Sequence, residues 1–509
     1  MSKGVAPLMI SNLALLIASC SAVAAPAPPV TRAPTSAGPA QGGESTALTV
    51  YNQGFAVVRE SFPLELQAGL NEIRRSGTTA QLEPDSVIFR DPTGAAAFRV
   101  LEQSYRNDPV SQGLLLSMFE GQEIDFQREL QGLGITIVRG RILRSGYDAT
   151  QARNGNYYSQ QQPLIEVAGR LQFQLPGVPL FPSLGNDAIL QPTLSWRVDS
   201  PAAARFQAEL AYVTAGLSWK ADYNLVAPAA GDIVDLVGWI TVDNQSGKRF
   251  DEARMKLMAG DVNKIQPQNM RGKLGMMPMA AMERDGSAVV TEKSFDEYHL
   301  YTLANPTTIR DGETKQVEFV RAAGVTARRL FVYDGAAQGQ FWFSDAANQE
   351  PGYGTQSQKK VWVMREFQNS EANRLGMPLP KGRLRFYQRD DDAQLEFLGE
   401  NEIDHTPKDE LVRVYVGNSF DLVGERSRTD FKIDSRGRWM DESFEVTLRN
   451  HKREPAIVRV VEHLYRWTNW QIVKPTQEWK KKDAQTIEFD VAVPADGEMK
   501  VAYTVHYSW

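Results

Sequence analysis

Short β-rich runs, each closed by a turn, recur along most of this chain and constrain its fold more than any other feature. Residues 47–51 and 56–60 flank a turn signal at 52–54. Residues 206–213 and 360–367 alternate apolar and polar side chains with a period of two, as half-buried strands do. No helical stripe of four turns competes with them. Strands at this spacing predict an all-β protein made of sandwiches or barrels.

The chain is long enough for several domains. It has 509 residues, whereas one domain usually holds roughly 100–200. We expect a signal peptide at 1–24, a Pro/Ala/Gly-rich tether at 25–46, an N-terminal β domain at 47–112, a small barrel-like insert at 113–198, a β-sandwich with a methionine-rich loop (264–291) at 199–350, and a C-terminal β-sandwich at 351–509. The insert, whose short strands begin with the triplet Leu114–Leu116, is expected to be an SH3-like barrel. The two sandwiches are expected to be immunoglobulin-like.

The N-terminus has the layout of a secretory signal. Lys3 precedes an apolar stretch at 8–18 that is too short for a stable membrane span. Two cleavage sites remain open: residues 17–20 resemble a bacterial lipobox in which Cys20 would carry the lipid, and residues 22–24 fit an A-x-A site. Either site predicts an exported protein. Lipidation at Cys20 would anchor it to the periplasmic side of the outer membrane through an N-terminal lipid, its only contact with a membrane, whereas cleavage after residue 24 would release a soluble chain into the periplasm.

Composition and motifs exclude several function classes. The net charge of −6 argues against a general nucleic-acid binder, and a single cysteine excludes a disulfide framework. The sequence contains no H-E-x-x-H, G-x-S-x-G or P-loop motif, so we predict no catalytic residues and no cofactor. Among the five scattered histidines, His451 and His463 lie in neighbouring predicted strands and could converge. Asp390 to Asp392 form the acidic tip of a predicted hairpin.

The methionine-rich loop is one candidate binding site. It contains five methionines, of which Met276, Met277 and Met279 form the compact part. Thioethers are soft ligands that suit Cu(I). The loop is therefore either a copper site or an adaptable apolar segment.

A tryptophan cluster near the C-terminus is the second candidate site. Trp467, Trp470 and Trp479 lie close together in sequence, next to a run of three lysines at 480–482. If these rings are exposed, they offer a stacking surface for a sugar or protein partner. If they are buried, they belong to the core of a sandwich.

From about residue 200 to the end, the chain carries motifs that resemble a bacterial family. These motifs are LSWKADY at 217–223, LPKGRLRFY at 379–387, VYVGNSFD at 414–421, and EVTLRNHK at 445–452 followed by VRVVE at 458–462. Together they resemble the family described as domain of unknown function (DUF) 4139. The better-known relatives of that family look like mucoidy-inhibitor proteins, whose coiled coil is missing here. The resemblance supplies no established catalytic residues.

The sequence thus favours an exported cell-envelope protein that acts as a non-catalytic scaffold or binding protein. Its sheet edges or loops would engage an envelope protein or a glycan. One alternative is a carbohydrate-active hydrolase whose carboxylates come together between domains. The other is a copper-handling protein that uses the methionine-rich loop.

Overall fold

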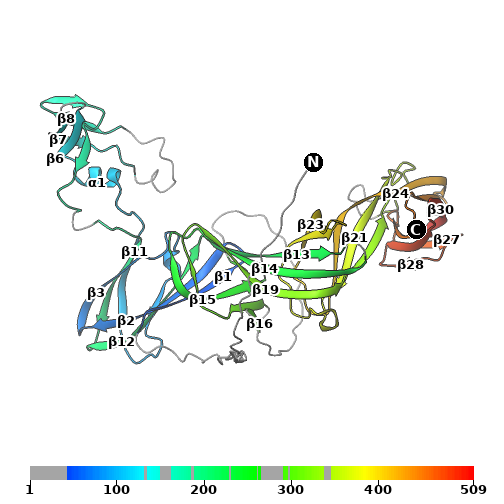
Figure 1. Ribbon diagram of the computed structural model, residues 1–509, viewed down its shortest axis with the longest axis horizontal. Helices are drawn as coiled ribbons and strands as arrows, with labels where there is room; N and C mark the ends of the chain where they lie inside the picture. The colour runs from blue at the N-terminus through cyan, green and yellow to red at the C-terminus, as the bar shows by residue number, and fades with distance from the viewer. Residues whose placement is uncertain are drawn as a thin grey trace, which may run out of the picture. The chain divides into compact units, whose positions relative to one another are not determined.

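A computed structural model describes residues 43–130, 134–148, 162–184, 188–228, 231–260, 262–264, 290–295, 298–336 and 346–509. Strands dominate these residues (Figure 1), and α1 (Gln112–Met118) is the one α-helix among them. The expected all-β, multi-sheet fold is confirmed. Two short 3-10 turns, η1 (Pro84–Ser86) and η3 (Glu371–Asn373), interrupt the strands.

An eight-stranded sheet forms one layer of the N-terminal sandwich. Its strands are β16 (Val290–Phe295), β17 (Tyr298–Leu303), β15 (Phe250–Ala259), β1 (Ser45–Tyr51), β2 (Phe55–Leu66), β12 (Ala204–Ala215) and β4 (Ile88–Arg90), with β18 (Thr307–Ile309) paired to β15. β1 and β2 are the predicted hairpin, and Gly54 at its turn has a φ of 85°, which suits glycine. β1 also pairs in parallel with β15. Strands from the ranges 47–112 and 199–350 therefore share one sheet.

A three-stranded sheet forms the facing layer. It consists of β3 (Gly69–Ser76), β11 (Thr193–Ser200) and β5 (Arg99–Arg106), with β11 in the middle. Leu194, Trp196 and Val198 of β11 are buried in the shared core. The Trp196 ring stacks on Phe89 of β4 with 4.5 Å between centroids, which joins the two layers.

The insert is a separate antiparallel unit with its own apolar cluster. Its strands run in the order β10 (Val178–Leu180), β6 (Glu123–Leu130), β7 (Gly134–Arg144), β8 (Leu164–Val167) and β9 (Arg170–Gln172). Phe126, Ile142 and Ile165 are fully buried between them. The triplet Leu114–Leu116, expected as a strand, lies in α1, so that expectation was wrong. Ser111 caps this helix by accepting a hydrogen bond from the Leu114 N–H.

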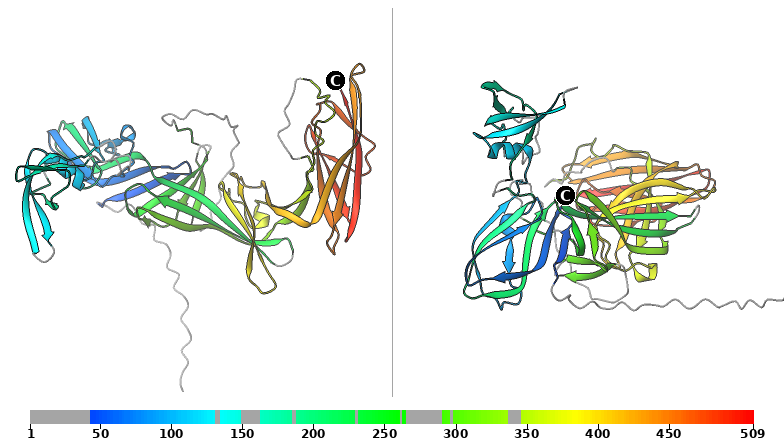
Figure 2. Two further views of the ribbon diagram at one scale, coloured as in Figure 1. Left: turned by 90° about the horizontal axis from the view of Figure 1, so that it is seen from above. Right: turned by 60° about the vertical axis from the view of Figure 1, so that its left-hand side comes forward.

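Two further sheets hold the C-terminal half. The five-stranded sheet runs β19 (Glu313–Thr326), β14 (Ile233–Asn244), β13 (Leu217–Ala227), β22 (Gly382–Arg389), β23 (Leu395–Ile403). The nine-stranded sheet runs β27 (Trp470–Val473), β30 (Gly497–Ser508), β25 (Trp439–Asn450), β24 (Leu411–Asp434), β21 (Lys360–Gln368), β20 (Arg328–Tyr333), β26 (Ala456–His463), β29 (Thr486–Val493), β28 (Lys480–Lys481). Figure 2 shows the strands from β24 onward, in yellow to red, side by side. β22 and β23 form the predicted hairpin with the acidic tip.

Two fully buried ion pairs lie inside the nine-stranded sheet. Arg426 Nε lies 2.9 Å from Glu462, and Arg466 Nη2 lies 2.9 Å from Glu442, with every one of these side chains at most 1% exposed. The Tyr503 hydroxyl also donates to Glu462, at 2.6 Å. Such pairs are expensive to desolvate, and removing one partner strands the other charge in the core.

Replacing Glu462 by alanine should therefore lower the free energy of unfolding by about 3–5 kcal/mol, because Arg426 would keep a buried, uncompensated charge. Urea denaturation followed by circular dichroism measures this change. Glu425→Ala is the matched control: Glu425 lies next to Arg426 in β24 and pairs with Arg449 near the surface, so its loss should be far smaller. Equal losses for the two variants would contradict the assignment.

Candidate functional site

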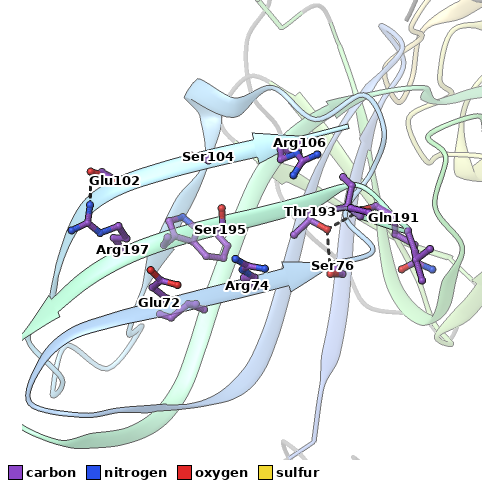
Figure 3. A pocket seen from close by; sticks show the side chains of 15 residues that line it. Glu72, Arg74, Ser76, Glu102, Ser104, Arg106, Gln191, Thr193, Ser195 and Arg197 are labelled. Atoms are coloured by element: carbon purple, nitrogen blue, oxygen red, sulfur yellow. Dashed lines mark hydrogen bonds and ion pairs between the residues drawn. The ribbon is translucent and has the colours of Figure 1, made fainter. Parts of the chain in front are cut away.

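A cleft of about 630 Å³ lies on the outer face of the three-stranded sheet, and we call it the β11 cleft. Strands β3, β11 and β5 form its floor, and the segment 188–191 forms one wall. Figure 3 shows ten polar or charged side chains around it: Glu72, Arg74, Ser76, Glu102, Ser104, Arg106, Gln191, Thr193, Ser195 and Arg197. The period of two in β11 produces this face, since its buried residues alternate with outward polar ones.

The strand register arranges the floor in three rows across the sheet. The rows are Glu72–Arg197–Glu102, Arg74–Ser195–Ser104, and Ser76–Thr193–Arg106. Side chains directly opposite each other on neighbouring strands lie about 5 Å apart at Cβ, so each row is a set of interacting groups.

Most side chains of the outer rows have partners within the chain, and Glu72 is the exception among the described residues. Arg197 donates to Glu102 across 2.8 Å, and Arg106 pairs with Asp108 at 2.7 Å. The Thr193 hydroxyl donates to the carbonyl of Gln191 at 2.8 Å. These contacts fix the two ends of the cleft floor.

The middle row is different. The Arg74 side chain is exposed and makes no hydrogen bond or ion pair with any residue in the described part of the chain. Ser195 is half-buried beside it, and Ser104 is exposed beyond Ser195. The centre of the cleft thus presents one guanidinium and two hydroxyl groups to solvent.

The wall of the cleft is apolar. Leu190 is 70% exposed, and Ile189 beside it is half-buried. The carbonyl of Ile189 accepts a hydrogen bond from the Val110 N–H at 2.8 Å, which ties the segment leaving β5 to the segment entering β11. The wall is therefore anchored at the point where the insert begins and ends.

The predicted tryptophan cluster is half-buried. Trp467, Trp470 and Trp479 all pack against the core of the nine-stranded sheet. Trp470 and Trp479 come together, with ring centroids 6.1 Å apart, and Lys481 Nζ lies 4.9 Å from the Trp470 ring. The Trp470 indole N–H is used internally, since it donates to the Ala484 carbonyl at 2.8 Å. A shallow hollow lies beside Trp479, lined by residues 475–479.

Other predicted site residues are not described by the structure. Cys20 and the methionines Met276, Met277 and Met279 lie outside the described residues, so lipidation and copper binding stay predictions. Within the described ranges, no group of three or more His, Cys, Asp or Glu side chains is placed to hold a metal ion.

The histidines of the C-terminal half have separate partners. His463 Nε2 lies 2.9 Å from Asp334 Oδ2, whereas His451 is exposed and its backbone N–H donates to the Asp421 carbonyl. The hydrogen bond that the His463 ring donates to the Asp334 carboxylate raises the pKa of His463 above its ordinary value of 6.5.

No sequence motif points to Arg74, Ser195 or Ser104. A signal was present, since residues 72–76 and 102–106 both place polar side chains at alternate positions. Local patterns in the sequence do not show that β3 and β5 pair on either side of β11. This pairing brings together strands from distant parts of the chain.

Comparisons of the chain with family models, with curated proteins and with solved structures found no match. Among the described residues, no helix has the length and apolar character needed to cross a bilayer.

The His463–Asp334 pair predicts a pH-dependent stability. Because folding raises the pKa of His463, the pair contributes its full stabilisation below about pH 6.5 and loses it as the pH rises through the folded-state pKa. The loss of unfolding free energy caused by His463→Gln should thus be larger at pH 6 than at pH 9. Urea denaturation at both pH values measures it. The control is His451→Gln, which replaces an exposed histidine. A change between the two pH values as large for this variant as for His463→Gln would contradict the assignment.

Proposed function

We propose that this protein is a non-catalytic binding or scaffold protein of the cell envelope, and that it holds its partner in the β11 cleft. The middle row of the cleft carries this proposal. Arg74, Ser195 and Ser104 line the cleft, and their side chains make no hydrogen bond or ion pair with any described residue. By contrast, contacts within the chain hold Arg197 and Glu102 on one side and Thr193 and Arg106 on the other. A rigid floor with unengaged polar groups is what a binding site requires.

The interior charges support a structural rather than a chemical role for acidic groups. The buried glutamates of the described residues are Glu60, Glu366, Glu442 and Glu462, and each is held by arginine or lysine. Glu60, for example, lies between Arg75, at 3.2 Å, and Lys248. A carboxylate engaged in this way is neither a free base nor a free acid.

A carbohydrate-active hydrolase is the second candidate. Glu72 and Glu102 both line the cleft, and glycoside hydrolysis uses a pair of carboxyl groups. They stand on β3 and β5, one on each side of β11, so their backbones are about 10 Å apart. Arg197 stands between them and pairs with Glu102. One member of this carboxylate pair is therefore engaged by a residue of the chain itself.

The envelope location and the family remain part of the proposal. The signal-like N-terminus supports export, and the lipobox supports an anchor at Cys20. The motifs at 217–223, 379–387 and 445–452 support a relation to the DUF 4139 family. The alternative function, copper handling, is supported only by the methionine-rich loop at 264–291.

Photo-crosslinking in cells tests the binding face. A photoreactive amino acid at Ser104, in the centre of the cleft, should form an adduct with an envelope component, because that position faces the proposed partner. The same amino acid at Arg436, an exposed turn residue of the nine-stranded sheet, is the control and should form none. Adducts of the same yield at both positions, or none at Ser104, would argue against the proposal.

The anchor has its own test. Mass spectrometry of the mature protein should show a chain that begins at a lipid-modified Cys20, and Cys20→Ser should abolish the modification. An unmodified chain that begins at Ala25 would reject lipidation and support cleavage after residue 24.

A further inference from the structure

We infer that the β11 cleft binds an acidic saccharide, with the carboxylate or phosphate group of one sugar unit held by Arg74 and its hydroxyl groups held by the surrounding side chains. This inference rests on the proposed function, because it names the ligand of the same face. It goes beyond that function by specifying the chemistry that the cleft selects.

Arg74 supplies the anion site. It stands between Glu72 and Ser76 on the same face of β3, and its side chain makes no hydrogen bond or ion pair with any described residue. Arginine offers a planar fork of donors that matches the two oxygens of a carboxylate or phosphate. The hydroxyl of Ser195, directly opposite Arg74 on β11, is placed to donate to the same anion.

The remaining lining favours a ligand rich in hydroxyl groups. Ten of the fifteen lining residues are polar or charged, whereas pockets for drug-like apolar ligands are lined mostly by apolar and aromatic groups. Ser76 and Ser104 can donate and accept, and the Gln191 side chain can do both. The volume of about 630 Å³ lies within the range of small-ligand pockets and leaves room for a short oligosaccharide segment.

The acidic row limits where a negative charge can bind. Glu72 and Glu102 flank Arg197, so this row presents more acceptors than donors. Such acceptors suit sugar hydroxyls and repel a second anion. The arrangement therefore selects a saccharide whose charge lies at Arg74 and whose neutral, hydroxyl-bearing part extends over the row of Glu72, Arg197 and Glu102.

Saturation-transfer NMR and calorimetry on the full chain test this inference. The probes are glucuronic acid, glucose 6-phosphate, glucose, acetate and inorganic phosphate. Arg74→Gln removes the charge, Arg74→Lys keeps the charge without the fork, and Arg436→Gln is the control with the same charge change in another sheet.

We expect an acidic sugar to bind the wild type and the Arg436→Gln variant equally, and to bind Arg74→Gln at least tenfold more weakly, with Arg74→Lys in between. A preference for glucuronic acid or for glucose 6-phosphate identifies the source of the charge. The inference is overturned if glucose binds as well as the acidic sugars, if acetate or phosphate alone binds as well as they do, if Arg74→Gln has no effect, or if no probe binds. Should a probe fail while Ser104 still crosslinks in cells, the ligand class is wrong and the binding face stands.

Discussion

The alternation of β11 is the constraint on which the site depends. Trp196 must face inward to stack on Phe89, and Leu194 and Val198 share its core. Because successive side chains of a strand point to opposite faces, this burial forces Ser195 and Arg197 outward. A register shift of one residue would turn the whole polar set into the core. The packing that joins the two sheets therefore also defines the floor of the cleft.

The C-terminal sheet uses buried charge in a different way. Arg466 does more than neutralise Glu442: it also donates to the backbone carbonyls of Asn348, Glu350 and Tyr353, at 3.0, 2.8 and 3.0 Å. One guanidinium thus holds this loop through three of its backbone carbonyls. A hydrophobic replacement could fill the volume but could not supply these donors. The buried Arg466 side chain thus orders this loop, and the removal of its charge from water costs free energy.

The sequence predicts local features of this protein well and long-range pairing poorly. The hairpin at Gly54 and the hairpin with Asp390 to Asp392 at its tip follow from turn chemistry between alternating runs. In the turn after β25, buried Asn450 donates to the Glu454 carbonyl and accepts from the Lys452 N–H. By contrast, the three consecutive leucines at 114–116 show neither the period of a helix nor that of a strand. In the structure they lie in a helix that Ser111 caps. The cleft needs strands that are distant in sequence to pair, and no local pattern encodes that.

The position of the insert explains how the cleft can be rigid although its strands are far apart in the chain. The polypeptide leaves the three-stranded sheet after β5, forms the insert, and returns through 188–191 into β11. The hydrogen bond from the Val110 N–H to the Ile189 carbonyl joins the segment that leads into the insert to the segment that leaves it. Beyond that bond, the insert can change in length or sequence without moving β5 relative to β11, since the ladder between them is continuous from Glu102 to Arg106. The wall formed by Ile189 and Leu190 lies on the sandwich side of this hydrogen bond. The residues that line the cleft therefore belong to the sandwich and its connecting segment, and none belongs to the strands of the insert.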